Sequence, residues 1–291
     1  MSRIHLTLSV DDRLWAPAYA AMRAVCLSTR RKPDLTFHVL HRPLAAEHFR
    51  TLEHITTEFG AALALYDLDA DSVFGWVTEK APAHAGIADL GYARLLLGEL
   101  LPRDLGQVVA LDCDMLVRAP VERIAELDLL DHAAAAAPLA DAKASMTGRM
   151  LIDPRGIFDA GGRYFDAGLM VIDLERWREL KLVEKFETLL DDGRLAQLRN
   201  AGEFLNLAVA DEWLELDQLW SLLDPRRELE PLNAFAVHYA GQRKPWQVGS
   251  RAAYARVYRH TMTNNVYYRF LAERLPPWLR PLVAWLGRTN G

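Results

Sequence analysis

The first seventy residues alternate strand-like and helix-like segments, and this alternation constrains the fold more than any other feature. Residues 3–10, 35–41 and 62–68 are typical of short strands, and residues 45–60 form an amphipathic helical pattern that ends at a glycine. Another helix is expected from about Pro17, because proline is favoured in the first turn of a helix. Strands separated by helices of this length predict βαβ units and a mostly parallel sheet.

The rest of the chain continues this pattern, apart from one loop. Helices are expected at residues 89–102 and 175–192, and strands at residues 108–117, 132–139, 164–174 and 236–240. Residues 140–163 are rich in Gly, Asp, Arg and Ala, and they are expected to form a mobile loop. The predicted fold class is therefore α/β, with a mostly parallel central sheet flanked by helices.

Composition excludes several classes of protein. The formal net charge of −5 lacks the basic excess of a nucleic-acid binder, so no nucleic-acid partner is expected. Cys26 and Cys113 are too few and too distant in sequence to form a disulfide framework. No apolar run approaches the roughly 18 residues that cross a membrane, and the N-terminus alternates too regularly for a signal peptide. We therefore expect a cytoplasmic protein.

Two aspartates interrupt the apolar stretch "VVALDCDMLV" (108–117), and they are the first candidate site. Carboxylates are rarely buried unless they are paired or bind a metal. Residues i and i+2 of a strand share a face, so Asp112 and Asp114 can point toward one Mg²⁺ or Mn²⁺ ion. Two alternatives stay open: a turn capped by aspartate, and a haloacid-dehalogenase-type phosphatase, whose usual Thr or Val is Leu116 here.

Four blocks of the chain, in the right order, resemble glycosyltransferase family 8. They are "LSVDDRLWAPAYAAMRA" (8–24), "GYARLLLGELLPRDLGQVVALDCDMLV" (91–117), "YFDAGLMVIDLERWRE" (164–179) and "VHYAGQRKPW" (237–246). The family includes retaining galactosyl- and glucosyltransferases of bacterial lipopolysaccharide. The resemblance implies a Rossmann-like nucleotide-diphospho-sugar transferase fold of the A type over residues 1–250.

The resemblance also implies a metal and donor site. Asp112 and Asp114, with His238, match the ligands of a Mn²⁺ (or Mg²⁺) ion that neutralises charge on the diphosphate of a UDP-sugar. The remaining matches are contacts with the donor. Lys244 and Gly241 match residues at the diphosphate, and Asp11 matches a residue at the nucleoside. Arg94 and Asp166 match residues at the sugar, and Asp112 also counts among the cofactor-binding residues.

The sequence departs from the family on the sugar side of this site. Ala201 and Gly202 stand where the family has an acid and an amide, and only Glu203 keeps an acid. Asp166 replaces an asparagine, and a carboxylate accepts hydrogen bonds where an amide also donates. Glu203 and Asp166 are therefore the catalytic candidates, unless catalysis is reduced.

Two functions follow from the resemblance. The first is a metal-dependent retaining transfer of a hexose from a UDP-sugar to a glycan or glycolipid acceptor, as in bacterial lipopolysaccharide or surface polysaccharide. A retaining same-face displacement depends on positioning and electrostatic stabilisation more than on an enzymatic nucleophile. The alternative is a catalytically reduced accessory protein that binds sugar nucleotides during polysaccharide assembly.

The C-terminal residues 251–291 are expected to form a helical extension. Residues 267–291 mix Trp, Leu and Arg, as in segments that lie at the inner face of a cell membrane. The alternative is a terminal helix packed on the domain or on a second subunit, as in a homodimer. Pro276, Pro277 and Pro281 predict two short helical pieces instead of one long helix.

Overall fold

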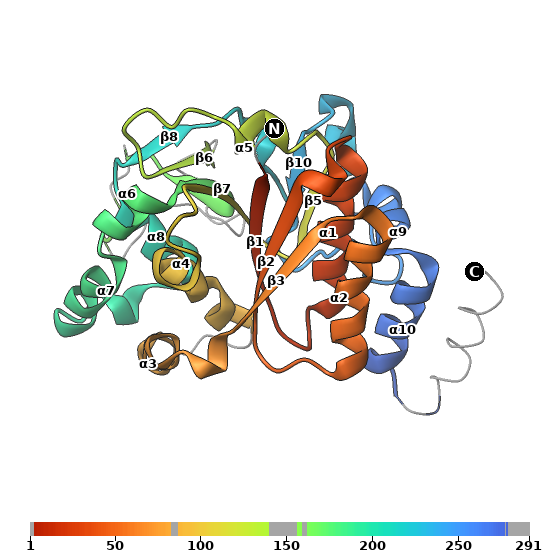
Figure 1. Cartoon of the computed structure of the whole chain (residues 1–291), viewed down its shortest axis with the longest axis horizontal. Coiled ribbons are helices and arrows are strands. Elements are labelled where there is room, and N and C mark those ends of the chain that lie inside the picture. The colour runs from red at the N-terminus through yellow and green to blue at the C-terminus, as the bar shows by residue number, and fades with distance from the viewer. Residues whose placement is uncertain (1–2, 83–86, 140–155, 159–161, 277, 279–291) are drawn as a thin grey trace.

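The computed structural model describes residues 3–82, 87–139, 156–158, 162–276 and 278 of the 291-residue chain. Within them, a seven-stranded sheet has the order β3-β2-β1-β4-β7-β6-β8 (Figure 1). Its strands are β1 (Ile4–Val10), β2 (Leu35–His41), β3 (Ala62–Asp67), β4 (Gln107–Leu111), β6 (Ala134–Pro138), β7 (Phe165–Asp173) and β8 (Trp213–Glu215). Strand β1 runs parallel to β2 and β4, β2 runs parallel to β3, and β6 runs parallel to β8, whereas β7 is antiparallel to both β4 and β6. The predicted α/β class is confirmed.

Helices cover both faces of this sheet. One face carries α1 (Trp15–Ser28) and α2 (Ala46–Phe59), with α9 (Ala255–Met262) and α10 (Asn264–Arg274) packed against α1. The other helices are α3 (Ser72–Lys80), α4 (Leu97–Leu100), α5 (Glu122–Ala125), α6 (Leu174–Glu179), α7 (Leu182–Asp191) and α8 (Ala201–Val209). The buried apolar side chains accordingly form two clusters, one on each face of the sheet.

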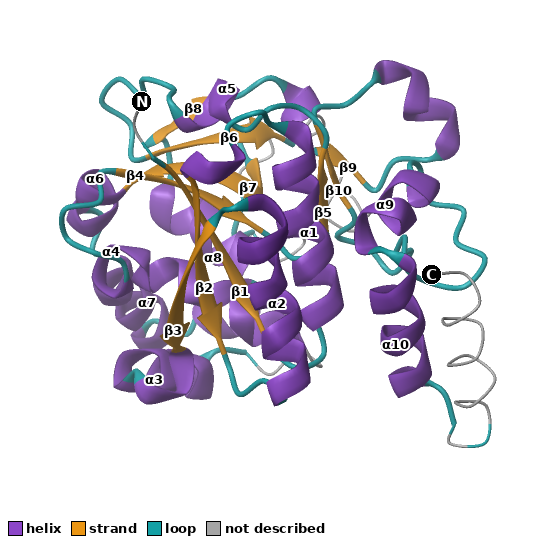
Figure 2. Ribbon diagram, turned by 45° about the vertical axis from the view of Figure 1, so that its right-hand side comes forward, coloured by secondary structure: helices purple, strands orange, loops and turns teal. Residues whose placement is uncertain are grey.

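A second, three-stranded sheet stands beside α1 (Figure 2). It has the order β5-β10-β9 and consists of β5 (Met115–Val117), β9 (Leu222–Leu223) and β10 (Ala236–His238). The stretch 108–117 was expected to be one strand, and this expectation is wrong: β4 and β5 lie in different sheets. The chain turns at residues 112–114, where the Met115 N–H donates to the Asp112 carbonyl at 3.3 Å. Pairing with β10 draws β5 away from the large sheet.

Two predicted helices also differ from the structure. Residues 87–96 form a 3₁₀ helix, and α-helical geometry begins only at α4. The predicted helix 175–192 is divided into α6 and α7, because Lys181 adopts a left-handed conformation with φ of 51°. The predicted end of α2 is confirmed, since Gly60 caps that helix with φ of 72°.

The described part of the C-terminal segment shares the core of the large sheet. Tyr258 and Phe270 are fully buried, and Phe270 meets the Trp15 ring edge-on at 5.9 Å between centroids. Helix α10 ends at Arg274, two residues before Pro276. No helix among the described residues is long and apolar enough to span a membrane. Most of the predicted loop 140–163 and the predicted second tail piece lie outside the described residues.

Candidate functional site

Asp112, Asp114 and His238 meet at the carboxyl end of β4, and we call them the candidate metal cluster. The two aspartates flank the turn between β4 and β5, and antiparallel pairing of β10 with β5 places His238 opposite Met115. One ligand atom from each of the three residues lies within 4.8 Å of the others. His238 Nε2 is 3.5 Å from Asp112 Oδ2 and 3.4 Å from Asp114 Oδ1.

These separations suit a bound divalent cation. Adjacent ligands of an octahedral ion, each about 2.1 Å from the metal, lie about 3 Å apart. Two carboxylates and an imidazole are also ligands that Mn²⁺ accepts. The chain does turn at Asp112 and Asp114, but the hydrogen bonds of their carboxylates go to Arg94 and Lys244 and do not cap the turn, which instead brings both carboxylates to the imidazole.

Asp166 and Gly168 of β7 fix the orientation of the His238 ring. Asp166 Oδ2 is 2.7 Å from His238 Nδ1 and also accepts a hydrogen bond from Ser221 Oγ. This contact leaves Nε2 facing the two carboxylates, the arrangement in which a second carboxylate orients a ligating histidine. A Cβ at Gly168 would lie 2.3 Å from His238 Nδ1, so β7 can approach the ring only because residue 168 is glycine.

Two cations bind the outer sides of the aspartates. Arg94 Nη2 donates to Asp112 Oδ1 at 2.8 Å and to the Gly168 carbonyl at 3.3 Å. Lys244 Nζ donates to Asp114 Oδ2 at 2.7 Å and also to the Tyr239 carbonyl. A positive group thus stands on each side of the cluster, where it could contact the phosphates of a ligand.

The electrostatics of the cluster favour positive charge at its centre. Burial alone would lower the pKa of His238, but Asp166 and Asp114 outweigh burial and raise that pKa well above its ordinary value. Burial alone would raise the pKa of Asp114 and of Asp166, yet His238 lowers both, helped by Lys244 at Asp114 and by Ser221 at Asp166. Asp114 and Asp166 are therefore ionised at neutral pH.

Gly241 lies in the loop after β10, and its backbone N–H donates to both oxygens of Asp224, at 3.0 and 2.8 Å. A Cβ at Gly241 would lie 2.6 Å from Asp224 Oδ2, so the glycine permits this close contact. Sequence reasoning missed Asp224 and Ser221, because neither belongs to a local pattern with a chemical meaning. Only the fold brings Ser221 to Asp166 and Asp224 to Gly241.

Asp11 lies just beyond the carboxyl end of β1, the strand beside β4. Its Oδ1 accepts hydrogen bonds from the N–H groups of Arg13 and Leu14, at 2.9 and 3.1 Å, and its Oδ2 pairs with the Arg13 guanidinium. The Cys113 thiol donates to the Ser9 carbonyl, so the metal-cluster turn rests against the end of β1. Asp11 is thus placed at the same edge of the sheet as the cluster.

Glu203, the other predicted acid, lies in the first turn of α8 and is buried. Its Oε2 accepts the Arg199 N–H at 2.8 Å, while its own N–H donates to Asn200 Oδ1 at 2.9 Å. The bond to Asn200 is that of a capping box, but the Glu203 carboxylate accepts from Arg199, one residue before the N-cap, and not from Asn200 itself. Ala201 packs against residue 91, since a Cβ on Gly91 would lie 2.9 Å from the Ala201 Cβ. The departure from the family at residue 201 therefore fills a tightly packed position.

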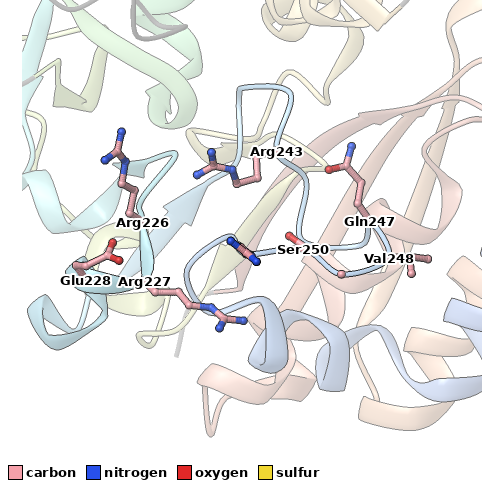
Figure 3. A pocket seen from close by; sticks show the side chains of 9 residues that line it. Arg226, Arg227, Glu228, Arg243, Gln247, Val248 and Ser250 are labelled. Carbon is pink, nitrogen blue, oxygen red and sulfur yellow. The ribbon is translucent and has the colours of Figure 1, made fainter.

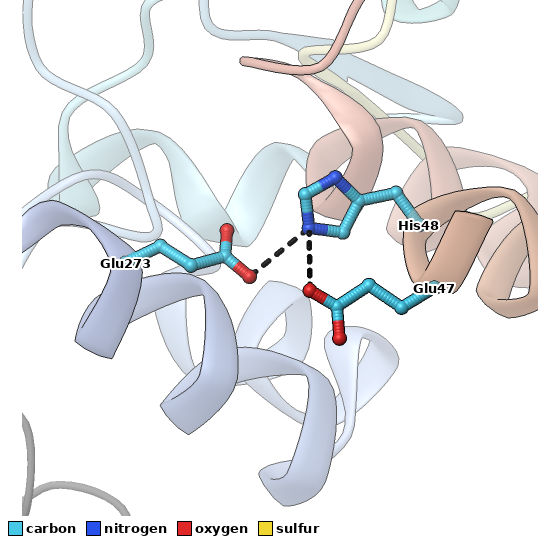
Figure 4. A group of neighbouring side chains, drawn as sticks. All are labelled: Glu47, His48 and Glu273. Atoms are coloured by element: carbon cyan, nitrogen blue, oxygen red, sulfur yellow. Dashed lines mark hydrogen bonds and ion pairs between the residues drawn. The ribbon is translucent and has the colours of Figure 1, made fainter. Parts of the chain in front are cut away.

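A second group with metal-ligand chemistry lies between α2 and α10 and consists of Glu47, His48 and Glu273 (Figure 4). We call it the anchor cluster. Both ring nitrogens of His48 have partners, since Nδ1 is 2.7 Å from Asp12 Oδ1 and Nε2 is 3.0 Å from Glu273 Oε1. The His48 ring also stacks on Trp15 at 4.4 Å, and the Trp15 indole donates to Glu273. This cluster joins α10 to the domain.

The mostly parallel seven-stranded sheet flanked by helices is the A-type fold seen in galactosyltransferase LgtC. Residues 5–249 match the model of the family described as glycosyl transferase family 8. The chain therefore belongs to glycosyl transferase family 8.

The chain is also similar to curated relatives and to solved structures. General stress protein A of Bacillus subtilis (strain 168) is 22% identical over 279 residues, which cover 89% of this chain and 93% of the relative. Lipopolysaccharide 1,2-glucosyltransferase of Escherichia coli is 24% identical over 289 residues, covering 94% and 79% of the two chains. The structure of galactosyltransferase LgtC with donor and acceptor sugar analogues matches with a TM-score of 0.68 and 20% identity, over 89% of this chain and 95% of LgtC.

Proposed function

We propose that this family 8 glycosyltransferase transfers a hexose from a UDP-sugar to a glycan or glycolipid, with retention of configuration and with Mn²⁺ or Mg²⁺ as cofactor. The observation that carries the proposal is the convergence of Asp112, Asp114 and His238 on one point, flanked by Arg94 and Lys244. Three ligand atoms beside two cations suit a metal-bound diphosphate better than a structural ion pair.

The chain's own residues would act mainly by binding and positioning. Asp112, Asp114 and His238 would hold the ion, whose chemistry is to neutralise charge on the leaving nucleoside diphosphate. Lys244 would contact that diphosphate, and Asp11 would contact the nucleoside. Asp166 keeps the His238 ring in place through a 2.7 Å contact. Both Asp166 and Glu203 are buried, and they remain the proposed acids on the sugar side.

The class of acceptor is suggested by a relative. The Escherichia coli relative is a lipopolysaccharide 1,2-glucosyltransferase, and it matches 94% of this chain. We infer an acceptor in bacterial lipopolysaccharide or a surface polysaccharide. We further propose that residues 1–250 form the catalytic domain and that the tail beyond α10, where Trp278 is 76% exposed, contacts a membrane surface or a second subunit.

A second function is favoured by one observation. Ala201 and Gly202 carry neither the acid nor the amide expected there, and the first turn of α8 uses Glu203 to accept a backbone N–H. A sugar-nucleotide-binding accessory protein with reduced catalysis would need the metal cluster but not these groups. Retention of two aspartates, His238 and Lys244 together argues against a merely structural relic, which has no physical need for a metal set and a phosphate lysine.

The test is a panel of nucleotide sugars, measured for binding and for hydrolysis with and without Mn²⁺. Mn²⁺-dependent binding and turnover of a UDP-hexose supports the transferase. Binding of UDP-sugars without turnover, when lipopolysaccharide fragments are supplied as acceptors, favours the accessory protein. No Mn²⁺-dependent binding of any nucleotide sugar contradicts both.

A further inference from the structure

A hollow of about 430 Å³ lies between two loops that follow β9 and β10 (Figure 3). One wall is formed by residues 226–228 and the other by residues 243–251. The loops are tied together by the contact of Gly241 with Asp224, by a hydrogen bond from the Ala253 N–H to the Pro225 carbonyl, and by a bridge between residues 226 and 252. The hollow therefore has fixed walls.

Four arginines line this hollow, namely Arg226, Arg227, Arg243 and Arg251, with Glu228 as its only acidic lining residue among those described. We call it the arginine groove. Within the described part of the chain, none of the four guanidinium groups forms a hydrogen bond or ion pair. This contrasts with Arg23, which pairs with Glu58 at 2.7 Å. The four like charges repel one another because no counter-charge from the described residues pairs with them. This positive group stands out on a chain whose net charge is −5.

The chemistry of the groove suits an anionic sugar derivative. Guanidinium groups bind phosphate and carboxylate through paired hydrogen bonds. A volume of about 430 Å³ is within the ordinary range of small-molecule sites. Gln247 braces one wall, because its side chain accepts the Lys244 N–H at 3.2 Å and donates to the Gln242 carbonyl at 3.1 Å.

The groove is adjacent to the candidate metal cluster. Arg243 directly precedes Lys244, whose Nζ reaches Asp114. Asp224, which holds Gly241, is two residues before Arg226. A ligand in the groove would therefore share a wall with the proposed donor site.

We propose that the arginine groove binds a phosphate or carboxylate group of the acceptor, so that the preferred acceptor is an anionic glycan. This inference rests on the proposed function and adds a substrate class to it. The groove selects the acceptor by charge, while the metal cluster and Lys244 serve the donor. Arginines that converge on a hollow also attract anions from solution and accelerate their encounter with the site.

The test uses glucose 6-phosphate as an anionic probe and glucose as its neutral match. Both are titrated calorimetrically into full-length protein saturated with UDP and Mn²⁺, which keeps the phosphate out of the donor site. The groove variant is Arg226→Gln/Arg251→Gln. The matched control is Arg30→Gln/Arg50→Gln, which removes the same charge from two exposed arginines far from the groove in sequence.

We expect the groove variant to bind glucose 6-phosphate about tenfold more weakly than wild type, since charge-assisted hydrogen bonds are lost. The control variant should keep wild-type affinity, and UDP and Mn²⁺ should bind all three proteins equally. Equal affinity of wild type and groove variant for glucose 6-phosphate would overturn the proposal. So would equal affinity of wild type for glucose and glucose 6-phosphate.

A lipid headgroup is the other source of phosphate, and a second arm separates it. Proteins are sedimented with vesicles of equal parts phosphatidylglycerol and phosphatidylcholine. Loss of vesicle binding in the groove variant alone would overturn the acceptor proposal in favour of a membrane contact. If UDP and Mn²⁺ do not bind, the proposed function fails, and the same sugar titrations without them still decide whether the groove binds anions.

Discussion

The candidate metal cluster and the anchor cluster each contain two acids and one histidine, yet their geometry differs. In the anchor cluster, both nitrogens of His48 lie within 3.0 Å of carboxylates, and the ring is stacked on Trp15. In the metal cluster, only Nδ1 of His238 makes so short a contact, and Nε2 lies 3.4 and 3.5 Å from two carboxylates. In the anchor cluster, both histidine nitrogens are already hydrogen-bonded. In the candidate metal cluster, one ligand atom of each residue still faces a common centre.

This difference shows that residue type alone does not identify a metal site. The anchor cluster joins two helices, and Glu273 is consumed in holding α10 against α1 and α2, while the exposed Glu47 comes only within 4.0 Å of His48. The candidate metal cluster lies in a turn at the carboxyl end of β4, where open α/β sheets bind ligands. Position in the fold and unconsumed ligand atoms distinguish a binding site from a structural network. The following predictions test that distinction, from the largest expected effect to the smallest.

Asp114→Asn should reduce Mn²⁺-dependent turnover of the donor by at least about 100-fold, because it removes a charged ligand and leaves Lys244 without its partner. Steady-state rates over a range of Mn²⁺ concentrations measure this loss. Glu273→Gln, the matched change in the anchor cluster, should leave turnover unchanged. Similar losses in both variants would show that the two clusters are not functionally distinct.

Asp166→Ala should weaken Mn²⁺ binding by about 10- to 100-fold, because the carboxylate that orients His238 is lost. Asp166→Asn should cost much less, since an amide oxygen can still accept from Nδ1. The dissociation constants for Mn²⁺ in the presence of UDP compare the two variants. Equal losses would mean that Asp166 acts through its charge and not by orienting the ring.

Gly168→Ala should displace the His238 ring, because the new Cβ would lie 2.3 Å from Nδ1. We expect weaker Mn²⁺ binding together with a loss of about 1–3 kcal/mol in the free energy of unfolding. Gly75→Ala in α3 is the control, since its Cβ would meet nothing within 4 Å, and alanine favours a helix. Wild-type Mn²⁺ affinity in Gly168→Ala would contradict the role of β7 in placing the ring.

His48→Ala should lower the free energy of unfolding by about 1–3 kcal/mol, since it removes the hydrogen bonds of the buried His48 ring to Asp12 and Glu273 and the stack on Trp15. Mn²⁺ affinity should not change. Urea unfolding and a Mn²⁺ titration of the same protein measure the two effects separately. A loss of Mn²⁺ affinity without destabilisation would make the anchor cluster a metal site.

Local patterns predicted much of the fold, and long-range pairing accounts for most of the differences. The period of β1, β2 and β3 and the glycine after α2 were readable from the sequence because they depend on nearby residues. The division of residues 108–117 into β4 and β5 was not, because it depends on pairing with β10, more than one hundred residues later. Lys181 separates α6 from α7 by adopting a left-handed conformation. This break could not be predicted, because the residue that usually signals such a conformation is glycine.

The residues of the candidate site were also predicted only in part. Asp112, Asp114, His238 and Lys244 were found through motifs, and the structure brings all four together. Asp224 and Ser221 were missed, since only tertiary contacts give them a role. Asn200 and Glu203 are three residues apart in the spacing of a capping box, so their hydrogen bonds could have been anticipated from "NAGEF".

The most direct test of the account is a Mn²⁺ titration in the presence of UDP, followed by electron paramagnetic resonance of the free ion. We predict one tight site in wild type that is retained in Glu273→Gln and lost in Asp114→Asn. Retention of the site in Asp114→Asn, or its loss in Glu273→Gln, would contradict the assignment of Asp112, Asp114 and His238 as the metal centre.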